Sequence, residues 1–127
     1  MHTFEQLQVW KEARSLRNQI ERLVKRLPKS EQYRLSDQII RSSRSITANI
    51  AEGYGRYHEG DAIRHCFFAR GSLFETLDHL ICARDLDLIS EKEFLEYRSV
   101  ISKCSAMLDG FIKYLKINRA IPSKKTP

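Results

Sequence analysis

The chain has 127 residues, a mass of 14.9 kDa and a formal net charge of +6; 42% of its residues are hydrophobic and 30% are charged. These values are typical of one soluble domain, and its apolar runs are much shorter than the roughly 18 residues that a membrane span requires. We therefore predict a single cytoplasmic domain that does not contact a membrane. The net positive charge makes RNA or DNA a candidate partner, because lysine and arginine side chains that bind phosphates release their counterions.

The first helix is predicted over residues 4–27. Thr3 can cap its amino end, with Gln6 as the second half of a capping box, and Pro28 stops it. Its apolar residues alternate spacings of four and three, which places them on one face. They are Val9, Ala13, Leu16, Ile20, Leu23 and Leu27.

The second helix is predicted over residues 31–53, with an inward stripe of apolar residues and one serine. These are Leu35, Ile39, Ser43, Ile46 and Ile50. Three glycines follow within the segment SITANIAEGYGRYHEGD. A phosphate-binding loop would need GxxxxGK followed by Ser or Thr, and a dinucleotide site would need GxGxxG after a strand. The segment offers only GxG after a helix, so we predict a turn in which a glycine forms the left-handed cap of the second helix.

The third helix is predicted over residues 61–86 and the fourth over 91–117. Asp61 can cap the third helix, and Ser90 with Glu93 forms a capping box for the fourth. The inward residues of the third helix are Ile63, Cys66, Phe67, Leu73, Phe74, Leu77, Leu80 and Ile81. Those of the fourth follow a strict heptad: Phe94, Tyr97, Ile101, Cys104, Leu108, Phe111 and Leu115.

No run of alternating apolar and polar residues indicates a strand. Four helices joined by short loops therefore predict an all-α protein, an antiparallel up-down-up-down four-helix bundle over residues 1–117. Residues 118–127, NRAIPSKKTP, contain two prolines and three basic side chains, which favour a flexible basic tail.

Arg70 falls near the middle of the apolar stripe predicted for the third helix. Burying an unpaired charge there would be costly, so a partner is required. We expect a structural polar network, rather than a catalytic group, in which Arg70 pairs with Glu52 or Glu12 or bonds to Asn49.

Several large apolar residues lie away from the predicted stripes. They are Leu7, Trp10, Ile40 and Phe68. A monomeric bundle would expose them, and clustered apolar residues on outer faces often form a protein contact. We therefore predict a homo-oligomer with these residues at its interface.

Basic residues form a modest patch on the outer face of the second helix. Arg41 and Arg44 point away from its apolar stripe, with Arg34 at the flank, although Asp37 dilutes the field. Together with Arg56, Lys124 and Lys125, they are the candidate contacts to RNA or DNA. The alternative is that these charges are only a solvated face.

The sequence contains no recognised catalytic or metal-binding pattern. The four histidines form no HExxH pair, the three cysteines form no CxxC pair, and no GxSxG elbow occurs. We therefore expect no catalytic, cofactor-binding or metal-binding residues, and a protein that is not an enzyme.

Two segments carry a family resemblance: SRSITANIAEGYGR, residues 43–56, and ARGSLFE, residues 69–75. Together with FEQLQVWKEAR and LPKSEQYRLSDQIIRSS, they resemble the 23S rRNA intervening-sequence proteins from about residue 4 to residue 115. The family's signature positions correspond to Asn49, Glu52, Gly53, Gly55, Arg56, Arg70, Gly71, Ser72 and Glu75.

The resemblance implies a bacterial four-helix bundle that assembles as a homopentamer. The family is also similar in fold to the accessory protein of diversity-generating retroelements, a basic pentamer that binds reverse transcriptase and nucleic acid. By that analogy we expect a non-enzymatic homo-oligomer that binds RNA, DNA or a reverse-transcriptase-like enzyme. The alternative is a protein-interaction scaffold without nucleic-acid binding.

Overall fold

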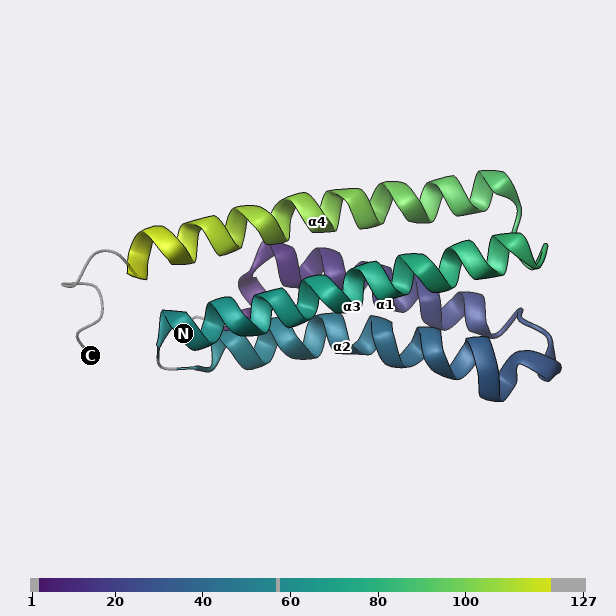
Figure 1. Cartoon of the computed structure of the whole chain (residues 1–127), viewed down its shortest axis with the longest axis horizontal. Coiled ribbons are helices and arrows are strands. Elements are labelled where there is room, and N and C mark those ends of the chain that lie inside the picture. The colour runs from purple at the N-terminus through teal and green to yellow at the C-terminus, as the bar shows by residue number, and fades with distance from the viewer. Residues whose placement is uncertain (1–2, 57, 120–127) are drawn as a thin grey trace.

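The structure is a computed structural model that describes residues 3–56 and 58–119. Four long helices make up most of this range: α1 (Gln8–Val24), α2 (Asp37–Tyr54), α3 (Glu59–Asp85) and α4 (Glu91–Arg119). Figure 1 shows them side by side along the long axis, each running opposite to the one before it. The predicted all-α four-helix architecture is confirmed, and no strand occurs in the described residues.

The helices follow one another around the bundle, with α1 against α2, α2 against α3, α3 against α4, and α4 back against α1. The most extensive of these interfaces lies between α2 and α3. The core is apolar and comes from every helix, so burial of the predicted stripes drives the packing. Its largest fully buried side chains include Leu16, Ile20, Leu23, Ile39, Ile46, Ile50, Leu73, Leu80, Ile101 and Leu108.

The amino-terminal helix is shorter than predicted. Thr3 caps a separate 3-10 turn, η1 (Phe4–Gln6), by accepting a hydrogen bond from the backbone N–H of Glu5 at 3.3 Å. Leu7 is extended, and α1 begins only at Gln8. The chain between α1 and α2 contains a 3-10 turn, η2 (Lys29–Glu31), and a π-helical turn, η3 (Gln32–Ser36).

The turn between α2 and α3 does not use a left-handed glycine. Gly55 follows α2 with φ −77° and ψ −6°, and no described glycine has a positive φ, so that prediction is wrong. Gly53 has a packing role instead, because a Cβ built on it would lie 3.1 Å from both the Ala62 carbonyl oxygen and the His65 Cβ. Its missing side chain lets α2 approach α3 closely.

The left-handed residue lies at the opposite end of the bundle, between α3 and α4. Asp87 has φ 58°, and its N–H donates to the Arg84 carbonyl at 2.9 Å. Leu88 N–H reaches the Ala83 carbonyl at 2.9 Å, which completes a Schellman motif. The α4 helix then begins as predicted, with Glu93 N–H donating to Ser90 Oγ at 3.1 Å.

The buried face of α3 differs from the prediction. Phe67 and Phe74 are exposed, whereas Ala62, Ala69 and Ala83 are buried. The α2 face opposite them carries small buried residues as well, including Ser42 and Gly53. Two helices with small residues in contact pack too closely to place a phenylalanine between them, which directs both rings to the edge of α3.

The predicted domain limit falls inside α4, which continues to Arg119. Residues 120–127, which contain most of the predicted tail, lie outside the described part of the chain. In the part that is described, no helix is long and apolar enough to cross a membrane.

Candidate functional site

Carboxylates neutralise most of the basic surface predicted on α2. Arg41 forms an ion pair with Glu75 of α3, and Arg44 Nε lies 2.7 Å from Glu21 Oε1 of α1. Arg56, just beyond the end of α2, pairs with Glu52 at 3.4 Å. These pairs leave little free positive charge on the outer face of α2.

The protonation of these groups agrees with their pairing. The hydrogen bond to Glu21 and the attraction of its carboxylate raise the pKa of the Arg44 guanidinium. A hydrogen bond with His79 Nε2, at 3.0 Å, and the nearby Arg41 lower the pKa of the Glu75 carboxyl. Both shifts favour the charged form of the group concerned, Arg44 or Glu75.

The remaining predicted phosphate contacts are dispersed. Arg34 is exposed at the π-helical turn and makes no ion pair within the described residues. Lys124 and Lys125 lie outside the described part of the chain. The predicted α2 surface is therefore not a continuous basic patch.

A row of unpaired cations occurs instead on the outer face of α1. We call it the α1 stripe, and it consists of Lys11, Arg14, Asn18, Arg22 and Lys25. At a rise of about 1.5 Å per residue, it extends about 21 Å along the helix. Its four cations are exposed, and none of them forms an ion pair within the described residues.

The carboxylates of α1 point sideways, away from the α1 stripe. Glu12 lies 3.4 Å from Lys103 Nζ of α4, and Glu21 pairs with Arg44 of α2. A hollow of about 270 Å³ runs along the stripe, lined by Lys11, Arg14, Ser15, Asn18 and Arg22. The predicted basic surface omits this row, although its spacing of three and four residues opposite the apolar stripe is visible in the sequence.

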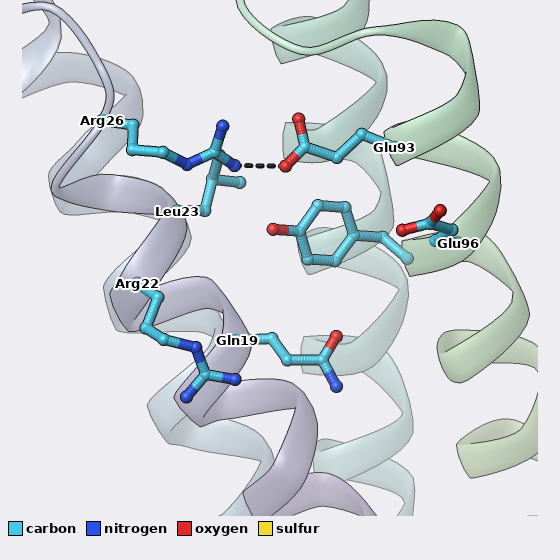
Figure 2. Close-up of a pocket in the computed structure, with 7 residues that line it drawn as sticks. Gln19, Arg22, Leu23, Arg26, Glu93 and Glu96 are labelled. Atoms are coloured by element: carbon cyan, nitrogen blue, oxygen red, sulfur yellow. Dashed lines mark hydrogen bonds and ion pairs between the residues drawn. The ribbon is translucent and has the colours of Figure 1, made fainter.

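A second hollow, of about 440 Å³, lies beside the stripe between α1 and α4. Its lining residues are Gln19, Arg22, Leu23, Arg26, Glu93, Glu96 and Tyr97. Figure 2 shows Arg26 and Glu93 facing each other across it, joined by an ion pair. Its two arginines balance its two glutamates, and burial raises the pKa of the Tyr97 hydroxyl. This hollow therefore offers neither a net charge for a phosphate nor an ionised tyrosine.

The polar network predicted around Arg70 is not formed. Arg70 Nε bonds to Asp109 Oδ1 of α4 at 3.0 Å, and its side chain is 42% exposed at the edge of α3. The three expected partners bond elsewhere: Glu52 to Arg56, Glu12 to Lys103, and Asn49 to Ser45 and His65. The prediction fails because the buried face of α3 is turned toward its alanines, which leaves Arg70 at the rim.

The apolar residues predicted for an oligomer interface are covered to different extents. Leu7 and Trp10 pack against the core, and the Trp10 ring meets Phe4 edge to face at 5.1 Å. Ile40 is half-buried, whereas Phe68 is 49% exposed. Much of this surface is therefore already covered within one chain.

The titratable groups do not form a constellation typical of catalysis. Within residues 3–56 and 58–119, no group of three or more His, Cys, Asp or Glu side chains is placed to hold a metal ion. Burial raises the pKa of the Cys66 thiol to about 11 and that of Cys104 to about 12, so both stay protonated at neutral pH. Cys82 is exposed and unpaired.

Comparison with known proteins places the chain in a family. The family model described as 23S rRNA-intervening sequence protein matches residues 5–110. The chain belongs to this family. A protein of unknown function from the S23 ribosomal protein family of Bacteroides thetaiotaomicron has a similar fold, with a TM-score of 0.77 and 24% identity over 83% of this chain and 95% of that one. The comparison with curated proteins gives no match.

The two segments that carry the family resemblance pack against each other. Ser72 Oγ of α3 donates to Ser45 Oγ of α2 at 2.9 Å, and the hydroxyls of Ser42 and Thr76 lie 2.8 Å apart just beyond the segments. Asn49 Oδ1 lies 3.3 Å from His65 Nδ1 in the same interface. The physical role of these segments is thus to join α2 and α3.

Proposed function

We propose that the chain is a non-enzymatic nucleic-acid-binding protein that holds a phosphate backbone against the α1 stripe. The observation that carries the proposal is the continuous row of four cations, Lys11, Arg14, Arg22 and Lys25, without a carboxylate among them. Free cations of this kind can replace the counterions of phosphates, whereas the arginines of α2 are already neutralised.

The length of the α1 stripe suits several consecutive phosphates. A duplex carries one phosphate charge per roughly 1.7 Å of its axis. A stripe about 21 Å long can therefore lie against several of these phosphates. Four phosphate contacts give a slope of about −3 to −4 in a plot of log affinity against log salt. Asn18 adds a neutral donor between the two arginines, which positions a strand without adding charge.

The test compares two double variants with the same change in net charge. Arg14→Gln/Arg22→Gln removes two cations of the α1 stripe, and Arg41→Gln/Arg44→Gln removes two ion-paired arginines of α2. Fluorescence anisotropy would follow binding to a short RNA duplex and a DNA duplex between about 50 and 200 mM salt. Circular dichroism confirms that both variants are folded.

We expect the α1 variant to bind at least about tenfold more weakly at low salt. The slope of log affinity against log salt should become less negative by about 2. The α2 variant should change both quantities much less. A larger loss of affinity in the α2 variant would contradict the proposal. It would instead support the basic surface on α2 that was predicted from the sequence. Absence of salt-dependent binding in the unaltered protein would overturn it in favour of a scaffold that binds only proteins.

A second candidate function, association with another protein, is supported by an apolar groove at the end of the bundle where α2 meets α3. The groove has a volume of about 290 Å³ and includes Leu7, one of the residues predicted at an oligomer interface. It is also lined by Tyr54, Phe111 and Tyr114, of which Tyr114 is 57% exposed. We propose that a second copy of the chain covers it, since the family resemblance implies that copies associate as a homopentamer. A reverse-transcriptase-like enzyme is the other partner that this resemblance suggests.

A further inference from the structure

A second groove lies between α3 and α4, and the surfaces described so far do not include it. Its volume is about 380 Å³, and it is lined by Phe67, Arg70, Asp109, Ile112, Lys113 and Lys116. Ile112 is buried, while Phe67 is 48% exposed at the wall of the groove. The groove therefore combines an apolar base, an accessible aromatic ring and charged side chains at its rim.

A cation lies over the aromatic ring of this groove, and another lies over Phe74, a ring next to Arg70 that is not among the lining residues. The Lys116 ammonium lies 5.4 Å from the centre of the Phe67 ring, and the Arg70 guanidinium lies 4.9 Å from the centre of the Phe74 ring. Phe67 and Phe74 are seven residues apart on α3, which separates them by about 10 Å along the axis. Phe74 therefore lies beyond the groove, about three 3.4 Å intervals of a stacked strand from Phe67.

The charge of the groove favours an anion. Three cations, Arg70, Lys113 and Lys116, are opposed by one carboxylate, Asp109, which already bonds to Arg70 at 3.0 Å. That bond fixes the guanidinium beside Phe74. Lys113 and Lys116 form no ion pair within the described residues, so no carboxylate competes with a phosphate for their ammonium groups.

We propose that this groove binds unpaired bases of a single-stranded nucleic acid. Phe67 stacks on a base, while Lys113 and Lys116 contact the phosphates. Aromatic rings recognise single strands because every unpaired base has an exposed π-face, whereas the bases of a duplex are already stacked on one another. The α1 stripe and this groove lie on separate surfaces, because α1 and α3 are diagonally opposite in the bundle. The two proposed sites therefore have only the class of ligand, a nucleic acid, in common.

The neighbouring phenylalanine supplies a matched control. Phe68 is 49% exposed, nearly the same as Phe67, and it also carries a cation over its ring, Arg64 at 5.8 Å. It does not line the groove. Phe67→Ala and Phe68→Ala therefore remove rings of equal exposure from the same helix, and only the first changes the groove.

The experiment measures binding of two short fluorescent single strands that carry the same number of phosphates. One has bases and the other is abasic. We expect the unaltered protein to bind the strand with bases at least about fivefold more tightly. Phe67→Ala should abolish this preference, and Phe68→Ala should keep it.

Equal binding of the two strands, or an equal effect of the two alanine variants, would overturn the inference. It would also be overturned if Phe67→Ala left the preference intact and shifted the sedimentation coefficient, because the ring would then serve a protein contact. Arg14→Gln/Arg22→Gln separates the two proposals, since it should weaken duplex binding and leave the preference for bases over abasic strand unchanged. A negative result for the groove would therefore not contradict binding of a duplex at the α1 stripe. A negative result for the α1 stripe would likewise not contradict binding of bases in the groove.

Discussion

Two glycines on the α2 and α3 helices occupy opposite environments. A Cβ on Gly53 would lie 3.1 Å from the Ala62 carbonyl oxygen and the His65 Cβ, both on the rigid backbone of α3 or next to it. A Cβ on Gly71 would meet nothing within 4 Å. Only Gly53 is therefore required by the packing of the single chain.

We expect Gly53→Ala to lower the free energy of unfolding by about 1–2 kcal/mol, because α2 and α3 must move apart. Gly71→Ala should raise it by about 0.5–1 kcal/mol, because alanine favours the helix interior. Urea denaturation of the two variants at one protein concentration measures both changes. Stabilisation by Gly53→Ala would contradict the close approach inferred at this position.

At the scale of the helices, two pairs of hydroxyl groups join α2 to α3. Ser42 Oγ and Thr76 Oγ1 lie 2.8 Å apart, and both residues are fully buried. Ser42 Oγ also lies 3.2 Å from the Ile39 carbonyl oxygen, and Thr76 Oγ1 lies 2.9 Å from that of Ser72. Because each hydroxyl has one proton, one of the two donates across the interface and the other donates to the carbonyl of its own helix. Small hydroxyl residues permit a short distance between helices while satisfying their own polar atoms.

A double-mutant cycle should detect this pair. We expect Ser42→Ala and Thr76→Val each to lower the free energy of unfolding by about 1 kcal/mol, since each leaves the other hydroxyl without its partner across the interface. The double variant should lower the free energy of unfolding by less than the sum of the two single changes. Exact additivity, measured by thermal or urea unfolding, would show that the two hydroxyls do not interact.

At the scale of the whole molecule, the exposed apolar surface predicts association of copies. Tyr114 lines the groove at one end of the bundle, whereas Tyr33, which is 81% exposed, lies in the connection between α1 and α2 at the other end. We expect sedimentation velocity of the unaltered protein to show a species larger than the monomer. Tyr114→Glu should shift it toward the monomer because a charge would be buried at the interface, and Tyr33→Glu should not.

Sedimentation of a monomer alone across the accessible concentration range would refute the association proposed at this groove. Loss of the larger species in Tyr33→Glu, with Tyr114→Glu unaffected, would move the interface to the other end of the bundle.

The helices themselves follow from the sequence, because their signals are local. The 3,4 spacing of apolar residues located all four helices, and the Ser90 cap located the start of α4 within one residue. The strict heptad of the fourth helix predicted all but one of its buried apolar residues: Ile112 is buried where the heptad placed Phe111, which is half-buried. The two quoted segments also indicated the family, since their order and spacing are properties of the chain alone.

The tertiary structure decided which charges are free and which rings are exposed. Arg41 and Arg44 have the sequence spacing of a basic face, but carboxylates of α3 and α1 lie close enough to neutralise them. Arg70 meets Asp109 because the small residues of α2 and α3 pack closely and turn the larger side chains of α3 outward. The pairing of a charge depends on the rotation of the neighbouring helices about their axes, and no local pattern in one helix specifies that rotation.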